Sequence, residues 1–149
     1  MKKIDYKKLA KYIIIPLILG FVVGFLSGSF KGYTNISTPK FIPPKIVFPI
    51  VWSILYVLMG ISRYLIDDKE DEIKIYNIQL AVNLLWSFFF FTFKWYLFSF
   101  LWIILLIILV IIMIIKFIKV SKTSGLIQIP YLLWLIFAAA LNYSIYLLN

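Results

Sequence analysis

The stretch "FIPPKIVFPIVW", residues Phe41 to Trp52, predicts the start of a helix within a strongly apolar sequence. Proline lacks a backbone N–H and clashes with the preceding turn, so a proline pair is excluded from a helix interior but tolerated at the first turn. Pro43 and Pro44 therefore predict a loop before them and a helix after them. Lys45 is the one charged residue in the stretch. Whether the apolar side chains of this helix face a protein core or lipid depends on whether the chain lies in water or in a membrane.

The composition of the whole chain indicates that this solvent is a lipid bilayer. Of the 149 residues, 64% are hydrophobic, and the mean hydropathy is +1.02, whereas soluble domains are roughly 45–50% apolar. Five apolar runs each approach the ~20 residues that a helix needs to cross the hydrocarbon core. We predict an all-α membrane protein, a single domain over residues 1–149 with five transmembrane helices. Their ranges are 12–30, 45–66, 73–93, 96–119 and 126–148.

The net charge of +9 reflects membrane topology and does not indicate nucleic-acid binding. If alternate loops face opposite sides, 11 of the 15 Lys and Arg residues share the side of the N-terminus, and 4 lie on the other side. The positive-inside rule then predicts a cytoplasmic N-terminus and a C-terminus outside, in a bacterial cell membrane. The acidic run at 67–72 is interpreted as a short solvated loop.

Several functional classes are disfavoured by residues that the chain lacks. It has no histidine and no cysteine, so we expect no disulfide and no metal site with the usual zinc or haem ligands. None of the five predicted helices contains Asp or Glu. Proton-coupled transporters and conventional acid–base enzymes both need such ionisable groups. A multidrug exporter that exchanges protons through a buried carboxylate is therefore disfavoured.

Aromatic and amide side chains repeat at helical spacing on three of the predicted helices. Because buried amides need partners in lipid, the face with Gln79 and Asn83 is expected to point into the bundle. The spacing alone slightly favours amides that merely clamp neighbouring helices. Trp52, Trp86 and Trp134 each share a helix face with polar side chains, which favours a place in a ligand pocket over a role as interfacial anchors. The three stripes are Trp52, Tyr56, Met59 and Arg63; Gln79, Asn83, Trp86 and Phe90; and Tyr131, Trp134, Ala138 and Asn142.

Two other features are interpreted as structural. Trp95 and Trp102, near the start of the predicted helix 96–119, are interpreted as interfacial membrane anchors. Gly20, Gly24 and Gly28 form a repeated small-xxx-small pattern that lets another backbone approach closely. That backbone belongs either to a second subunit or to another helix of the same chain.

Three blocks of the sequence resemble, in order, signature motifs of the TspO/MBR family, the tryptophan-rich sensory and translocator proteins. They are "PKFIPPKIVFPIVWSILYVLMG", "QLAVNLLWSFFFF" and "PYLLWLIFAAALNYSIYLLN", on the second, third and fifth predicted helices. The resemblance implies a five-helix membrane fold, often a homodimer, with a ligand pocket between the helices beneath the loop that joins the first two. It also implies binding of porphyrins and related tetrapyrroles, benzodiazepine-type ligands and, in some members, cholesterol.

Carried over to matching positions, the resemblance implies that the indoles of Trp52 and Trp134 face the ligand, with Asn83 and Trp86 on the opposite wall. The family's tryptophan two residues before the proline pair is Phe41 here, which keeps an aromatic surface without an N–H donor. The expected ligand-binding residues are Phe41, Pro43, Pro44, Trp52, Tyr56, Asn83, Trp86, Tyr131, Trp134, Ala138 and Asn142.

A porphyrin, a flat aromatic plate with two propionates on one edge, suits such a pocket. Trp52 and Trp134 would stack on the plate. Lys45 is expected at the mouth, roughly 10 Å from Trp52 along the helix at ~1.5 Å per residue. Lysines at the mouth would meet the carboxylates, because the segment 31–45 has three lysines and no acidic residue. Without His or Cys as an axial ligand, a metal-free tetrapyrrole such as protoporphyrin IX fits better than haem, and no cofactor is expected. Steroid binding is unsupported, because Leu147 stands where the family's cholesterol motif needs a basic residue.

Three functions remain open from the sequence. The preferred one is a membrane protein that binds porphyrins as a sensor or carrier. The second is a light- and oxygen-dependent enzyme that degrades bound porphyrin, with Trp52 and Trp134 as electron donors. The third is a regulatory or structural membrane subunit whose pocket is vestigial.

Overall fold

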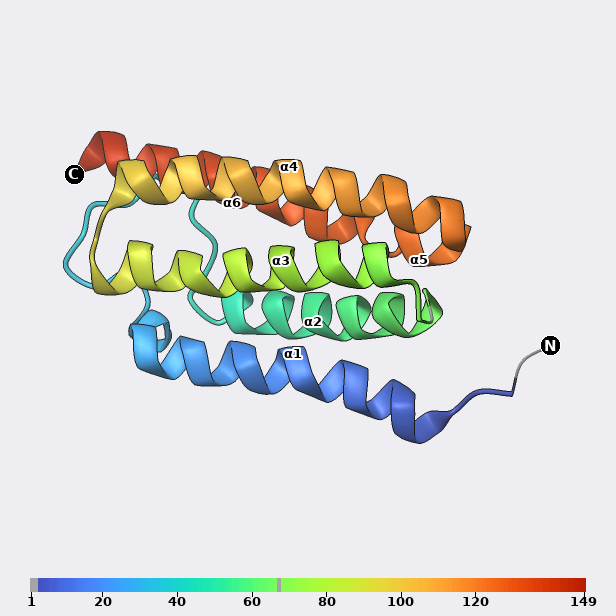
Figure 1. The fold of residues 1–149 in the computed structure, drawn as a ribbon. Coiled ribbons are helices and arrows are strands. Elements are labelled where there is room, and N and C mark those ends of the chain that lie inside the picture. The colour runs from blue at the N-terminus through green and yellow to red at the C-terminus, as the bar shows by residue number, and fades with distance from the viewer. Residues whose placement is uncertain (1–2, 67) are drawn as a thin grey trace.

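The computed structural model describes residues 3–66 and 68–149, which form a bundle of helices (Figure 1). Among these residues, five helical spans are long and apolar enough to cross a membrane, so the predicted fold class is confirmed. The elements are α1 (Tyr6–Ser27), η1 (Ser29–Lys31), α2 (Val47–Leu65), α3 (Glu70–Ser87), η2 (Phe88–Thr92), α4 (Tyr96–Val120), α5 (Lys122–Leu126) and α6 (Ile129–Leu148). The fifth span consists of α5 and α6 together.

The helices lie side by side along one long axis, with α1 at an edge of the bundle (Figure 1). α1 packs mainly on α2, while α4 packs on both α3 and α6. The core follows α4 and its neighbours, where Met59, Val110, Met113, Phe117 and Leu135 are fully buried. α1 instead exposes large apolar side chains over most of its length, as expected for a helix that faces lipid.

The bounds of α1 differ from the predicted range 12–30. The helix begins at Tyr6, because the Asp5 carboxylate accepts a hydrogen bond from Lys8 N (3.2 Å) and caps the first turn. It ends at Ser27, because Gly28 adopts a left-handed conformation (φ 86°) that terminates helices. The predicted start at residue 12 is too late, because the prediction follows uncharged runs and the first turns of α1 contain lysines.

Pro16 consequently lies in the interior of α1, where it offers no N–H to the carbonyl of Tyr12 one turn earlier. That part of α1 lies close against α2. A Cβ added at Gly60 would come within 2.5 Å of the Tyr12 carbonyl oxygen. Gly60 therefore allows the two backbones to approach where the proline interrupts the hydrogen bonding of α1.

The proline pair lies in the loop that leads into α2, as the sequence predicts. Val47 N donates a hydrogen bond to the carbonyl of Pro44 (2.9 Å), and α2 begins at Val47. The proline within the first helical turn is Pro49, at a position where an N–H would have no helical partner.

The fifth span is interrupted, in contrast to the continuous helix predicted for 126–148. α5 ends at Leu126 and α6 begins at Ile129, with Pro130 in its first turn. Because Pro130 has no N–H and its ring clashes with a preceding turn, it favours a new helix start over continuation. The Ser62 hydroxyl donates to the Ser124 carbonyl (2.6 Å) and joins α2 to α5.

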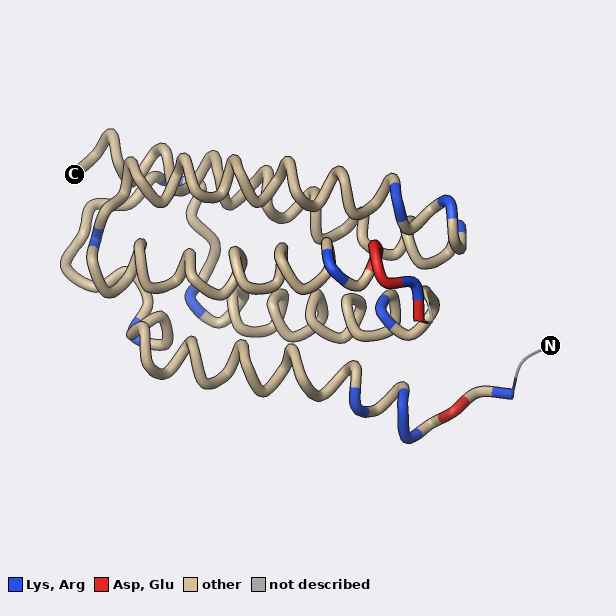
Figure 2. The backbone as a smooth tube through the Cα atoms, in the orientation of Figure 1, with Lys and Arg blue, Asp and Glu red and all other residues tan. Residues whose placement is uncertain are grey.

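Charged residues gather at the end of the bundle that holds the N-terminal segment, the α2–α3 connection and α5 (Figure 2). There Lys8 Nζ lies 3.7 Å from an Asp68 carboxylate oxygen, and the Arg63 guanidinium lies 4.3 Å from the centre of the Tyr12 ring. The structure thus places at one end of the bundle the segments that the count of Lys and Arg residues assigned to one side of the membrane. Which side faces the cytoplasm stays a prediction.

The two tryptophans near the start of α4 differ in their surroundings. Trp95 is 53% exposed, which suits an interfacial anchor. Trp102 instead donates from Nε1 to the Val82 carbonyl (2.8 Å), so it also holds α4 against α3.

Candidate functional site

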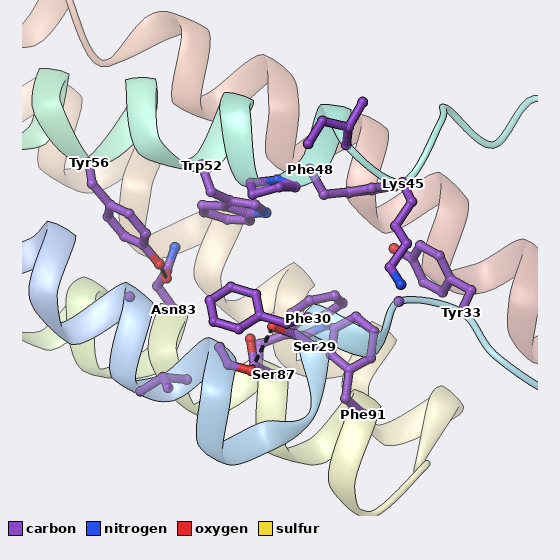
Figure 3. A pocket seen from close by; sticks show the side chains of 17 residues that line it. Ser29, Phe30, Tyr33, Lys45, Phe48, Trp52, Tyr56, Asn83, Ser87 and Phe91 are labelled. Atoms are coloured by element: carbon purple, nitrogen blue, oxygen red, sulfur yellow. Dashed lines mark hydrogen bonds between the residues drawn. The ribbon is translucent and has the colours of Figure 1, made fainter.

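A cavity of about 400 Å³ lies between α1, α2 and α3, next to the connection from α1 to α2 (Figure 3). This volume falls within the roughly 300–1,000 Å³ of typical small-molecule sites. Aromatic and apolar side chains dominate its walls.

α2 contributes an aromatic stripe to the cavity. Phe48, Trp52 and Tyr56 follow one another at four-residue intervals and all line it, because residues so spaced share a helix face. The rings of Trp52 and Tyr56 lie 5.7 Å apart. Trp52 and Tyr56 are expected from the sequence. Phe48 is not, although the same spacing extends back to it.

α3 and the π-helical turn η2 form a second wall. Asn83, Trp86 and Ser87 line the cavity from α3, and Phe91 continues the wall from η2. A π-turn inserts an extra residue into the helical repeat, which explains why the α3 periodicity predicts Asn83 and Trp86 but not Phe91.

The glycines of α1 form the third wall. A side chain at Gly20 would collide with the ring of Tyr56, and one at Gly24 would collide with the ring of Phe30. The pattern that begins with these two glycines therefore serves contacts within the chain. Of the two alternatives left open by the sequence, these positions support the internal one.

The floor of the cavity is held by a chain of hydrogen bonds. The Tyr56 hydroxyl donates to Asn83 Oδ1 (2.9 Å), Asn83 Nδ2 donates to the Tyr131 hydroxyl (2.8 Å), and the Tyr131 hydroxyl donates to Gln79 Oε1 (2.8 Å). This chain joins α2, α3 and α6. The prediction that Gln79 and Asn83 point into the bundle is confirmed, since both are buried. Their amides do clamp helices, and Asn83 also lines the cavity.

A second amide positions Trp86. Its indole Nε1 donates to Asn142 Oδ1 (3.0 Å), while Asn142 Nδ2 donates to the Tyr96 carbonyl (2.8 Å). The Trp86 ring also stacks on Phe90, with centroids 5.0 Å apart. These contacts fix the orientation of the indole in the cavity wall.

Lys45 is the one charged side chain among the described residues that line the cavity. Its stem passes over Gly32, where an added Cβ would lie 2.9 Å from Lys45 Cε. Figure 3 shows the ammonium beside Tyr33, and burial raises the pKa of the Tyr33 hydroxyl, which keeps it neutral. The described acidic residues lie at the opposite end of the bundle (Figure 2). The mouth of the cavity is therefore positively charged.

Three expected residues lie behind this cavity. Trp134, Ala138 and Asn142 line a separate hollow of about 10 Å³, room for about one water molecule. Phe48 and Trp52 line both spaces, and Phe48 packs edge-on against Trp134 with centroids 5.9 Å apart. Trp134 therefore supports the aromatic wall from behind.

Four further expected residues line neither space. Phe41 is half exposed and packs against Phe137, with centroids 6.1 Å apart. Pro43 and Pro44 lie in the connection just before α2. Tyr131 is fully buried within the hydrogen-bonded floor.

The TspO/MBR family model matches residues 12–148 of this chain. The chain belongs to the TspO/MBR family. It is 37% identical to the tryptophan-rich protein TspO of Archaeoglobus fulgidus, over 95% of this chain and 97% of that protein. It is 35% identical to Protein CrtK of Rhodobacter capsulatus over 78% of each chain. The translocator protein of Ovis aries is 29% identical over 91% of this chain and 86% of that protein. Since five spans lie within residues 3–66 and 68–149, this TspO/MBR protein is an integral multi-pass membrane protein.

Phe30 and Tyr33 also line the cavity, and the sequence reasoning does not identify them. Both lie in the connection between α1 and α2, where helical periodicity carries no information. The one feature of the sequence that points to a turn here is the pair Gly28 and Gly32. In the structure these glycines have positive φ angles of 86° and 69°. Glycine there permits a tight reversal, and the reversal brings both rings back over the helices.

Proposed function

We propose that this TspO/MBR protein binds porphyrins in the cavity between α1, α2 and α3 and serves as a sensor or carrier. The observation that supports this most directly is an aromatic-walled cavity with Lys45 as the one cation among its described lining residues. A flat aromatic ligand can stack on the Trp52 indole. Carboxylates on one edge of the ligand can then pair with the Lys45 ammonium.

The polar groups inside the cavity favour a ligand with an apolar body. The Tyr56 hydroxyl and the Asn83 amide bond to each other and, through Asn83, to Tyr131. The Ser29 hydroxyl donates to the Gly24 carbonyl (3.2 Å). These three groups are already engaged by protein partners. Stacking and apolar contact therefore hold most of the ligand body, and the positively charged mouth selects the edge that carries carboxylates. Because the chain contains no His or Cys, metal-free protoporphyrin IX is the appropriate probe.

The test is a titration of the purified protein with protoporphyrin IX in the dark, followed by tryptophan fluorescence. We expect saturable quenching, weakened by Lys45→Gln because the carboxylate loses its charged partner. Lys40→Gln is the matched control, since Lys40 is an exposed lysine of the same connection that does not line the cavity. Absence of saturable quenching in the wild type would refute porphyrin binding.

Two further measurements refine the proposal. Protoporphyrin dimethyl ester lacks the free carboxylates, so Lys45→Gln should not weaken its binding. Repeating the titration under illumination separates binding from degradation, because protein-dependent loss of the porphyrin absorption bands would favour the enzyme. The homodimer stays a prediction, which light scattering on the purified protein measures.

A further inference from the structure

A short turn carries Phe30 back over the cavity. This turn, Gly28–Gly32, consists of the three residues of η1 with a glycine on either side. Gly28 has φ 86° and Gly32 has φ 69°. Glycine populates positive and negative φ about equally, so both ends of the turn can change backbone conformation at low energetic cost.

The ring of Phe30 stands at the middle of the cavity. Figure 3 shows it facing Trp52, between the floor at Asn83 on one side and the mouth at Lys45 and Tyr33 on the other. All five residues line the same space. Phe30 nevertheless remains 45% exposed, so surrounding side chains enclose only about half of it.

The hydrogen bonds of the turn are local: the Ser29 hydroxyl donates to the Gly24 carbonyl (3.2 Å), and Gly32 N donates to the Ser29 carbonyl (2.9 Å). The helix end before the turn is instead fastened to a neighbouring element. The Thr92 hydroxyl donates to the Ser27 carbonyl (2.9 Å) and fastens the end of α1 to η2.

Beyond the end of α1, the ring of Phe30 rests over Gly24 and lies 5.4 Å from the ring of Phe21 on the same helix. These contacts are with α1, and the Lys45 stem lies over Gly32 at the other end of the turn. Movement of the turn therefore displaces local contacts and the flexible Lys45 side chain, and it leaves the packing between helices intact.

We propose that Phe30 is a movable wall of the cavity that contacts the ligand opposite Trp52 and controls passage between the mouth and the floor. With the ring in its present position, a flat ligand is held between Trp52 and Phe30. With the turn displaced about Gly28 and Gly32, the cavity, which already extends from the mouth to the floor, widens at its middle, and a ligand can enter or leave. The inference rests on the proposed function only for the choice of porphyrin as probe.

The first test needs no ligand. Ser87 lines the cavity and lies on the side of the Phe30 ring away from Trp52 in the view of Figure 3. The chain has no other cysteine, so Ser87→Cys gives a single reactive thiol inside the cavity. Its rate of modification by an aromatic maleimide should rise severalfold when Phe30→Ala is added. Phe21→Ala, which removes the partner ring outside the cavity, should leave that rate unchanged.

The second test follows protoporphyrin IX by stopped-flow quenching of tryptophan fluorescence. Phe30→Ala should speed both association and dissociation severalfold, while Phe21→Ala should change neither rate. Phe30→Leu, which keeps an apolar side chain, should give intermediate rates and replaces Phe30→Ala if that variant does not fold.

Thiol modification at the same rate with and without Phe30, or an equal increase in Phe21→Ala, would overturn the proposal. These outcomes are independent of porphyrin. Failure of the wild type to bind porphyrin refutes the proposed function, while the thiol measurement still decides the role of Phe30.

Discussion

Replacing Asn83 by leucine should destabilise the protein, because it removes the centre of the hydrogen-bonded cavity floor. Asn83→Leu eliminates the bond from the Tyr56 hydroxyl (2.9 Å) and the bond to the Tyr131 hydroxyl (2.8 Å). Hydrogen bonds between membrane helices average about 0.6 kcal/mol each and reach about 1.7 kcal/mol, so the expected loss of unfolding free energy is about 1–3 kcal/mol. Leucine has a similar size, which keeps the loss of packing small.

The measurement is detergent-driven unfolding followed by circular dichroism. Asn77→Leu is the matched control, since Asn77 is an exposed asparagine on the same helix. Tyr56→Phe removes only the first bond. In a double-mutant cycle it should therefore couple to Asn83→Leu by about 0.6 kcal/mol or more.

Two outcomes would refute this reasoning. If Asn83→Leu is as harmless as Asn77→Leu, the floor does not hold the helices together. If Tyr56→Phe and Asn83→Leu are additive, their hydrogen bond contributes nothing to stability. Unchanged stability combined with a collapse of porphyrin affinity would make Asn83 a ligand contact only.

Three further predictions concern the ligand, the topology and the connection between α1 and α2. Stacking on an aromatic ring contributes about 1–3 kcal/mol, so Trp52→Ala should weaken porphyrin binding roughly ten-fold or more. The supporting Trp134→Ala should have a smaller effect and the exposed Trp95→Ala none; equal effects in a fluorescence titration would contradict this ranking. Ser37→Cys should react with an impermeant thiol reagent added from outside, because the basic residues place this connection there; labelling from the cytoplasmic side alone would reverse the topology. Asn149 donates to the Ser37 carbonyl (2.8 Å) and accepts from its N–H (3.0 Å), so Asn149→Ala should speed proteolysis within this connection, and unchanged cleavage would show that the tether is unimportant.

Local patterns in the sequence predict part of the candidate site well. Trp52 and Tyr56 lie in the cavity wall, because four-residue spacing on a helix survives folding unchanged. The same holds for Asn83 and Trp86 on α3. Trp134 also has the expected spacing, but periodicity specifies only which residues share a face. It does not specify how many layers of side chains separate that face from a cavity.

The sequence by itself determined the number of spans, the segments that share each end of the bundle, and the inward face of α3. These features follow from hydropathy and helical repeat, which act over one or a few turns. Tertiary structure alone decided that Gly20 and Gly24 accommodate rings of their own chain, and that Phe30 faces Trp52 across the cavity. Such contacts depend on backbone reversals at Gly28 and on the packing of α1 against α2. The pairs Gly20 with Tyr56 and Phe30 with Trp52 join residues far apart in the chain, and no local pattern encodes them.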